Sequence, residues 1–255
     1  MNNRLLIAVT FLLFIVSACT KDDSVNPDGS NVNVFNNRQS TGSSANAILS
    51  DNTFKSMAIE LVYVEGYEPT QTTVDNFVSF LTKYAHKPSG ITVNKRAIAS
   101  LGQETYSIEE IADIEREERK NYNTNNTIAI WAYFTDGKSD KDTSENVILG
   151  TAYWNTSFVI YEETIQGLSN SPLEPSRSLL ESTVINHEFG HILGLTNLGS
   201  PMQTDHEDAE HEHHCNVEDC LMYWATESYV RIGNTTAVPE LDAQCIADLR
   251  ANGGK

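Results

Sequence analysis

Basic side chains are scarce in this 255-residue chain, which has 17 Lys and Arg against 35 Asp and Glu and a net charge of −18. Without a basic stripe the chain cannot neutralise a row of phosphates, which excludes a nucleic-acid partner bound through its backbone. The sequence also has no internal repeat. Apolar residues make up 40% of the chain and aromatic residues 9%, which excludes wholesale disorder. The length suits one domain of up to about 200 residues with a tail, or two small domains.

The chain also lacks an apolar run long enough to span a bilayer, which takes about 20 residues. The shorter run from Leu5 to Ala18 follows Arg4 and is typical of a secretory signal peptide. It ends in Val16-Ser17-Ala18-Cys19, which resembles a lipobox. The resemblance implies cleavage after residue 18 and a lipid anchor on Cys19.

The residues after Cys19 divide into a tether and a folded domain. Residues 19–47 are rich in Asn, Ser, Asp and Gly, and we expect a flexible tether there. We expect residues 48–255 to form the folded domain. We therefore predict a lipoprotein of the bacterial cell envelope, and the acidic residues after Cys19 favour the outer membrane and its exposed surface over the inner membrane.

Cysteine is rare as well. Once Cys19 is acylated, three thiols remain, and an oxidising compartment permits one disulfide among them. The first choice for this disulfide is the close pair Cys215 and Cys220, with Cys245 either free or exchanged for one of them.

Strand-like and helix-like segments alternate from about residue 50, which favours an α/β domain with a mixed sheet flanked by helices. Capping-box patterns at Ser107–Glu110 and Ser178–Glu181 predict the starts of two helices. We expect strands over residues 57–64, 91–99, 127–134, 147–153 and 157–161, and helices over 73–86, 107–122, 178–194 and about 239–250.

The helix after Ser178 contains His187-Glu188-Phe189-Gly190-His191. Histidines four positions apart on a helix lie one turn apart, so both can reach one Zn²⁺. Glu188 lies beside them, where its carboxylate can take a proton from metal-activated water as the general base. Apolar residues such as Ile185 occupy the other face, and Gly194 is well placed to end the helix.

Catalytic zinc usually has three protein ligands, so His187 and His191 leave the site incomplete. Here the sequence resembles the metzincin metalloproteases, whose motif is HExxHxxGxxH followed by a Met-turn. Residues 187–194 match as HEFGHILG, but Asn197 stands where the third His is expected. The resemblance implies a metzincin-like α/β fold, with a mixed, mostly parallel twisted sheet, flanking helices, an active-site helix and a Met-turn.

The loop after Asn197 offers replacements for the missing ligand. Its end, His214-Cys215-x₄-Cys220-x-Met222, is similar to the archaemetzincin motif, which implies His214 as the third ligand and Met222 as the Met-turn residue. His206 stays open as the alternative third ligand, because Gly199–Met202 can turn the chain back after the helix. Archaemetzincins also bind a structural zinc through four Cys. The three Cys left here predict no such four-Cys site.

Several neighbours have roles that the sequence leaves open. Asp205, Glu207 or Asp208 could orient a ligand histidine through a hydrogen bond. Tyr223 or Tyr229 could stabilise a developing oxyanion, although packing is the more usual role of a Tyr.

We therefore predict a zinc-dependent metallopeptidase with Zn²⁺ held by His187, His191 and His214, and Glu188 as the catalytic base. Its substrate is a peptide or protein, aligned by strand addition along Gly150–Trp154. The alternative is a non-catalytic zinc-binding surface lipoprotein that uses the acidic, His-rich loop.

Overall fold

The computed structural model describes residues 23–25, 31–172, 174–227 and 237–255. Its centre is a five-stranded sheet with the order β4-β3-β6-β9-β8. The first four strands in that order run parallel, and β8 pairs antiparallel with β9 at the edge. The predicted mixed, mostly parallel sheet is therefore confirmed. The strands are β3 (Ser56–Val64), β4 (Ile91–Ile98), β6 (Thr127–Phe134), β8 (Gly150–Trp154) and β9 (Ser157–Ile160); the short strands are β1 (Asp23–Val25), β2 (Asn31–Asn33), β5 (Thr105–Tyr106) and β7 (Lys138–Ser139).

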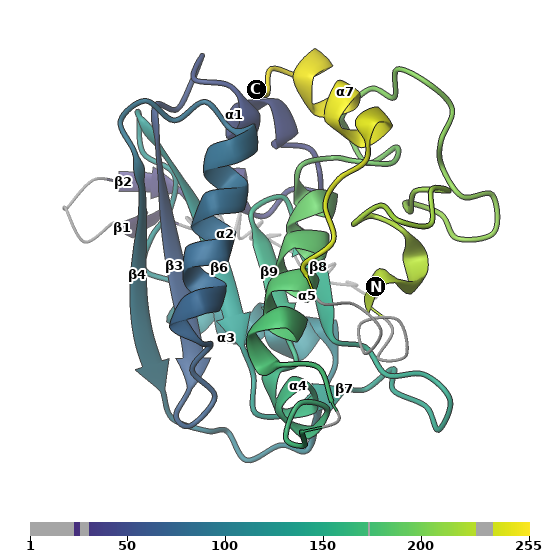
Figure 1. Ribbon diagram of the computed structural model, residues 1–255. Helices are drawn as coiled ribbons and strands as arrows, with labels where there is room; N and C mark the ends of the chain where they lie inside the picture. Colours follow the sequence, from purple (N-terminus) through teal and green to yellow (C-terminus); the bar gives the residue numbers. More distant parts are fainter. Residues whose placement is uncertain (1–22, 26–30, 173, 228–236) are drawn as a thin grey trace, which may run out of the picture.

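Both faces of the sheet are buried, which explains why its central strands are almost continuously apolar. In β6, Ile130 packs into one core and its neighbour Trp131 packs into the other, because successive side chains point to opposite faces. Figure 1 shows α2 and α5 side by side over one face and α3 behind the sheet. The helices are α1 (Ala45–Leu49), α2 (Gln71–Tyr84), α3 (Ile108–Glu118), α4 (Glu162–Gly167), α5 (Arg177–Ile192) and α7 (Ala243–Ala251), with 3₁₀ turns η1 (Val34–Asn37) and η2 (Trp224–Glu227).

The segment from residue 31 to 47, inside the predicted tether, packs against the domain. Val34 and Asn37 are completely buried. The Asn37 amide donates hydrogen bonds to the carbonyl of Ala129 in β6 and to the hydroxyl of Thr156. Polar residues that sequence composition assigns to a tether are thus ordered by side-chain hydrogen bonds to distant strands, and the packed domain begins upstream of residue 48.

The capping-box prediction holds at one helix and fails at the other. At α3, Ser107 and Glu110 exchange both hydrogen bonds of the box. At α5, the cap is Ser176, and the helix has already begun at Arg177. Glu181 instead accepts hydrogen bonds from Thr70 at the start of α2, so the fold uses its carboxylate to join two helices.

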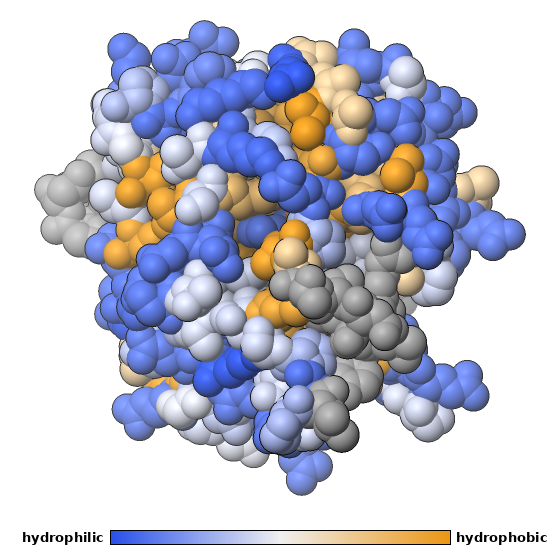
Figure 2. Space-filling view, in the orientation of Figure 1, coloured by the Kyte–Doolittle hydropathy of each residue, from blue (hydrophilic) through white to orange (hydrophobic). Residues whose placement is uncertain are grey.

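The surface facing the viewer in Figure 2 is mostly hydrophilic, with small hydrophobic patches between polar side chains. This agrees with the acidic composition of the chain. Among the residues that the structure describes, no helix combines the length and the apolar character needed to cross a bilayer. Cys19 and the predicted signal peptide lie outside the described residues.

Candidate metal centre

Helix α5 is held in place by apolar contacts with the sheet and with α2. The ring of Phe189 meets Phe77 of α2 and Phe158 of β9 edge-to-face, with centroids 5.1 and 6.2 Å away. The helix ends at Ile192, and Gly194 follows with φ of +75°, a conformation that glycine adopts without a steric penalty. The predicted apolar face and the predicted stop at Gly194 are both confirmed.

Three histidines converge at the C-terminal half of this helix. His187 and His191 lie one turn apart with ring centroids separated by 4.9 Å, and His214 closes the triangle at 5.3 and 5.2 Å from them. One nitrogen of each ring lies within 4.8 Å of the other two. Three imidazole nitrogens at this spacing can share a single ion about 2.0–2.1 Å from each.

The environment keeps these histidines neutral, which is the form that binds metal. Burial, aided by the neighbouring His214, lowers the pKa of His187 to about 3. Burial also lowers the pKa of His191 well below its ordinary value and lowers that of His214. A cluster that resists protonation near neutral pH is suited to a cation.

Backbone carbonyls orient two of the rings. Nδ1 of His187 lies 2.8 Å from the carbonyl oxygen of Leu221, and Nδ1 of His214 lies 2.9 Å from that of Glu212. A carbonyl only accepts, so each Nδ1 carries the proton and each Nε2 presents its lone pair. Nδ1 of His191 is buried without a hydrogen-bond partner among the described residues. The donor set therefore fits zinc.

Glu188 connects the histidine cluster to the edge of the sheet. Its Oε2 accepts a hydrogen bond of 2.6 Å from the backbone N–H of Ala152 in β8. Gly150 faces the same side chain so closely that a Cβ there would lie 2.8 Å from Cγ of Glu188. The strand thus fixes one carboxylate oxygen beside His187 and His191.

Met222 packs against α5 at Gly190, the residue before His191. It is fully buried, and a Cβ on Gly190 would lie only 2.2 Å from its Sδ. The absent side chain at Gly190 therefore makes room for the methionine. A role for Gly190 was not predicted from the sequence, although its place inside the motif could have pointed to a close approach.

The cluster opens into a cavity of about 460 Å³. Its walls come from β8, from the end of the His-rich loop and from the N-terminal segment, which contributes Thr41. Gly42 explains how that segment comes so close, because a Cβ there would lie 2.0 Å from the carbonyl oxygen of Leu198. The sequence did not predict Thr41 or the backbone N–H of Ala152, since neither carries a recognisable pattern.

The structure separates the other ligand candidates from this cavity centre. His206, the alternative third ligand, is fully buried elsewhere, with Nε2 2.7 Å from Oδ2 of Asp248 and Nδ1 3.4 Å from Sγ of Cys215. The amide of Asn197 bonds to Glu207 instead.

The structure also places the loop carboxylates and the tyrosine whose roles the sequence left open. Asp208 bonds to His211 on the loop surface, so the carboxylate that orients His206 comes from α7 and not from the loop. Tyr223 packs against Trp224 and does not line the cavity. Tyr229 lies outside the described residues.

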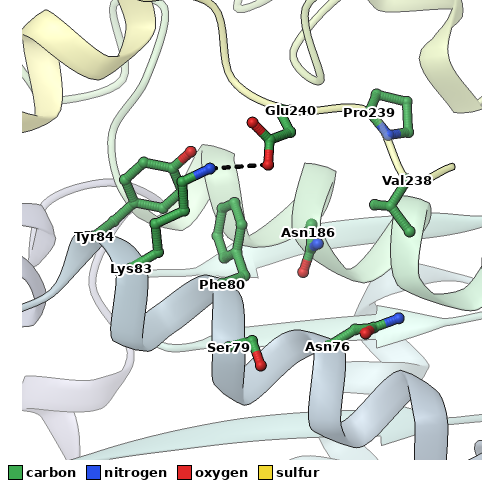
Figure 3. A pocket seen from close by; sticks show the side chains of 9 residues that line it. All are labelled: Asn76, Ser79, Phe80, Lys83, Tyr84, Asn186, Val238, Pro239 and Glu240. Atoms are coloured by element: carbon green, nitrogen blue, oxygen red, sulfur yellow. Dashed lines mark hydrogen bonds and ion pairs between the residues drawn. The ribbon is translucent and has the colours of Figure 1, made fainter.

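A smaller cavity of about 210 Å³ lies between α2, α5 and the segment before α7 (Figure 3). It is lined by Asn186, the residue before His187, but contains none of the predicted site residues. Its ion pair joins Lys83 to Glu240 at 2.9 Å between largely exposed side chains. Such pairs contribute little, so this cavity has no comparable chemistry.

The fold resembles that of a solved structure. Archaemetzincin from Methanopyrus kandleri superposes with a TM-score of 0.53 at 18% identity, covering 78% of this chain and 96% of the other. A zinc-dependent peptidase from Methanocorpusculum labreanum gives 0.47 at 13% identity over 75% and 99%, and metalloproteinase-II from Bacteroides fragilis gives 0.44 at 12% over 80% and 54%. No family model and no curated sequence matches the chain.

Proposed function

We propose that this protein is a zinc-dependent peptidase of the metzincin type, with archaemetzincin-like features in the segment from His214 to Met222. The observation that carries the proposal is the convergence of three neutral histidines and one carboxylate at a single cavity. The archaemetzincin-like fold supports it, and residues of α5 and of the edge strand β8 line that cavity. His187, His191 and His214 are the residues that hold zinc.

Zinc at these residues supplies Lewis-acid chemistry, which activates a water molecule and polarises the scissile carbonyl. Glu188 acts as the general base: its Oε1 takes the proton of the attacking water and passes it to the nitrogen of the leaving amine. The hydrogen bond from Ala152 to Oε2 keeps the carboxylate oriented during both transfers. The carbonyls of Leu221 and Glu212 hold the imidazoles in the tautomer that binds metal.

The substrate is an extended peptide that lies along β8. This strand ends the sheet order and pairs only with β9 among the described strands, and its residues Gly150–Ala152 line the cavity. Main-chain groups along an edge can add a peptide as a further strand. The scissile bond would then lie beside Glu188.

The proposal is tested with full-length protein and a mixture of peptides of random sequence. Cleavage products are identified by mass spectrometry before and after zinc is removed with a chelator. We expect cleavage that stops on chelation and returns with added zinc. Absence of cleavage in zinc-loaded, folded protein would contradict the proposal and favour the non-catalytic zinc-binding lipoprotein.

We also propose that the protein is a lipoprotein anchored through Cys19, on the basis of Val16-Ser17-Ala18-Cys19. Cys19→Ala is expected to move the protein from the membrane fraction to the soluble fraction. Mass spectrometry of the wild-type N-terminus gives the independent measurement, and an unacylated Cys19 would contradict the anchor.

A further inference from the structure

Three buried cysteines and one buried histidine form a second cluster behind the first. Cys215, Cys220, Cys245 and His206 are all fully buried, and the thiols are free, so the disulfide expected between Cys215 and Cys220 is not formed. Sγ of Cys220 lies 3.6 Å from Sγ of Cys245, and Nδ1 of His206 lies 3.4 Å from Sγ of Cys215. Potential ligand atoms of His206, Cys215, Asp242 and Cys245 all lie within 4.8 Å of one another.

These separations match a tetrahedral zinc site. With Zn–S near 2.3 Å and Zn–N near 2.0–2.1 Å, two sulfurs on one ion are about 3.8 Å apart, and a sulfur and a nitrogen are about 3.6 Å apart. The measured 3.6 and 3.4 Å are close to both values. Cys₃His is also a common structural zinc set.

The surrounding backbone and side chains are arranged to support ligands. Backbone N–H groups of Met222 and Asp242 point at Sγ of Cys220 at 3.4 Å, and that of Val217 points at Sγ of Cys215 at 3.5 Å. Nε2 of His206 lies 2.7 Å from the buried carboxylate of Asp248, an arrangement that fixes the ring of a metal-binding histidine. These hydrogen bonds to two buried thiols and a buried imidazole go beyond what apolar packing requires.

From this geometry we infer that Cys215, Cys220, Cys245 and His206 hold a second, structural zinc ion. The archaemetzincin resemblance implies four cysteines at a structural zinc, and this domain has only three. The structure supplies the fourth ligand from His206, in the His-rich loop after Asn197. Each thiol releases its proton to solvent as its sulfur binds the ion, and no redox step is involved.

Asp242 also lies near the sulfurs, but its carboxylate has another role. Its Oδ1 accepts the backbone N–H of Cys245 at 2.9 Å and thereby caps α7. His206 has no helix to cap and points its Nδ1 at Cys215. The imidazole is therefore the fourth ligand, and Asp242 is a structural neighbour.

The second site would also position the first. Cys215 directly follows His214, and its N–H donates to the carbonyl of Met222 at 2.7 Å. An ion that joins Cys215 to Cys220 and Cys245 would hold both the third histidine and the methionine in place. Ordering of the loop end therefore depends on the buried ion.

The test replaces zinc in the full-length protein with Co²⁺, whose bonds to thiolates give intense near-ultraviolet charge-transfer absorption that histidine ligands alone do not give. We expect this band in the wild type and in His214→Ala. In His206→Ala the affinity for the thiolate-bound cobalt, measured by chelator competition, is expected to fall by at least about 10-fold. His206→Cys should keep the band, and Asp242→Asn should leave it unchanged.

A wild type without the band, a Cys220–Cys245 disulfide in metal-loaded protein, or unchanged cobalt affinity in His206→Ala would each overturn the inference. If His206→Ala does not fold, the thiolate–cobalt band of the wild type and of His206→Cys still tests the inference. The readout does not depend on peptidase activity. Glu188→Gln protein should show the same band, so failure of this inference is distinguishable from failure of the proposed function.

Discussion

The two clusters that meet at residues 214 and 215 differ in how they face solvent. The histidine cluster opens into a cavity, and His191 and His214 are only partly buried. The cysteine cluster is closed, and its four proposed ligands are fully buried. Structural zinc sites are closed and catalytic sites keep an open position. This difference is the one expected if the proposed catalytic zinc binds to the first cluster and the inferred structural zinc to the second.

The largest expected effect is on the rate of peptide cleavage, and it comes from a substitution of Glu188, which belongs only to the open cluster. Glu188→Gln keeps the size of the side chain but removes its capacity to accept a proton. We expect folded, zinc-loaded protein whose rate of peptide cleavage falls by at least about 10²-fold.

The measurement is kcat/KM on a cleaved peptide, together with zinc content by elemental analysis. Glu212→Gln is a matched control, because Glu212 also lines the cavity but contacts His214 through its backbone carbonyl. Equal losses in both variants would remove the specific role of Glu188.

The next effect separates His214 from its former alternative, His206. Both substitutions to Ala are expected to lower total zinc, so zinc content alone does not distinguish them. His214→Ala should abolish measurable cleavage and keep the thiolate–cobalt band, because only the open cluster loses a ligand.

His206→Ala should weaken the thiolate–cobalt band and reduce cleavage only as far as the loop end loosens. The two absorption spectra and two cleavage rates, measured on the same preparations, give the answer. Loss of the thiolate band in His214→Ala would show that His214 supports the cysteine cluster, which would contradict its assignment to the open cluster alone.

The sequence predicts the open cluster, because the patterns that carry it are local. It does not predict the closed cluster, since it favours a Cys215–Cys220 disulfide and leaves His206 as an alternative ligand of the first site. The spacing of His187 and His191 requires only a helix, and the motif from His214 to Met222 is compact. The sequence could not show that Asp248 orients His206, since the two residues lie 42 positions apart and meet only after α7 packs.

Helix starts illustrate the same limit. Ser178 and Glu181 have the spacing of a capping box, but Thr73 and Arg177 compete for the Glu181 carboxylate in the folded chain. Local spacing cannot reveal such a competition, because Thr73 lies on another helix. The local pattern at Ser107 meets no such competitor and predicts the helix start correctly.

A pH effect distinguishes the histidines of the two clusters. The pKa of His187 is lowered to about 3, chiefly by burial, and that of His191 is lowered strongly for the same reason. Although burial opposes it, hydrogen bonds to Asp248 and Cys215 raise the pKa of His206.

Below about pH 6.5 these two histidines therefore become protonated in the unfolded chain but stay neutral in the folded protein. In metal-free protein, acidification from pH 6.5 to 5 should lower the free energy of unfolding, by about 2 kcal/mol through His187 alone. Urea unfolding of the wild type and of His187→Gln at both pH values measures this. An equal pH dependence in the two proteins would contradict the prediction.

A smaller effect is expected where α5 meets Met222. Gly190→Ala places a methyl group against Sδ of buried Met222, and overpacking of this kind costs about 1–3 kcal/mol. The better helix propensity of Ala offsets up to about 1 kcal/mol of that. Gly167→Ala in α4 is the control, because no atom lies within 4 Å of the added Cβ. Thermal unfolding should show destabilisation only at Gly190.

The smallest effect is expected at His211, which lies in the same loop as His206 and His214 but belongs to neither cluster. Its ring stacks on partly exposed Trp224 with centroids 4.1 Å apart, and its Nδ1 lies 3.2 Å from a carboxylate oxygen of Asp208. His211→Ala removes only these surface contacts, so stability should change by about 0.5 kcal/mol or less. Zinc content, the cobalt spectrum and the cleavage rate should stay at wild-type values. A loss of metal in this variant would mean that the loop binds zinc as a whole, as the non-catalytic alternative requires, and not through two separate clusters.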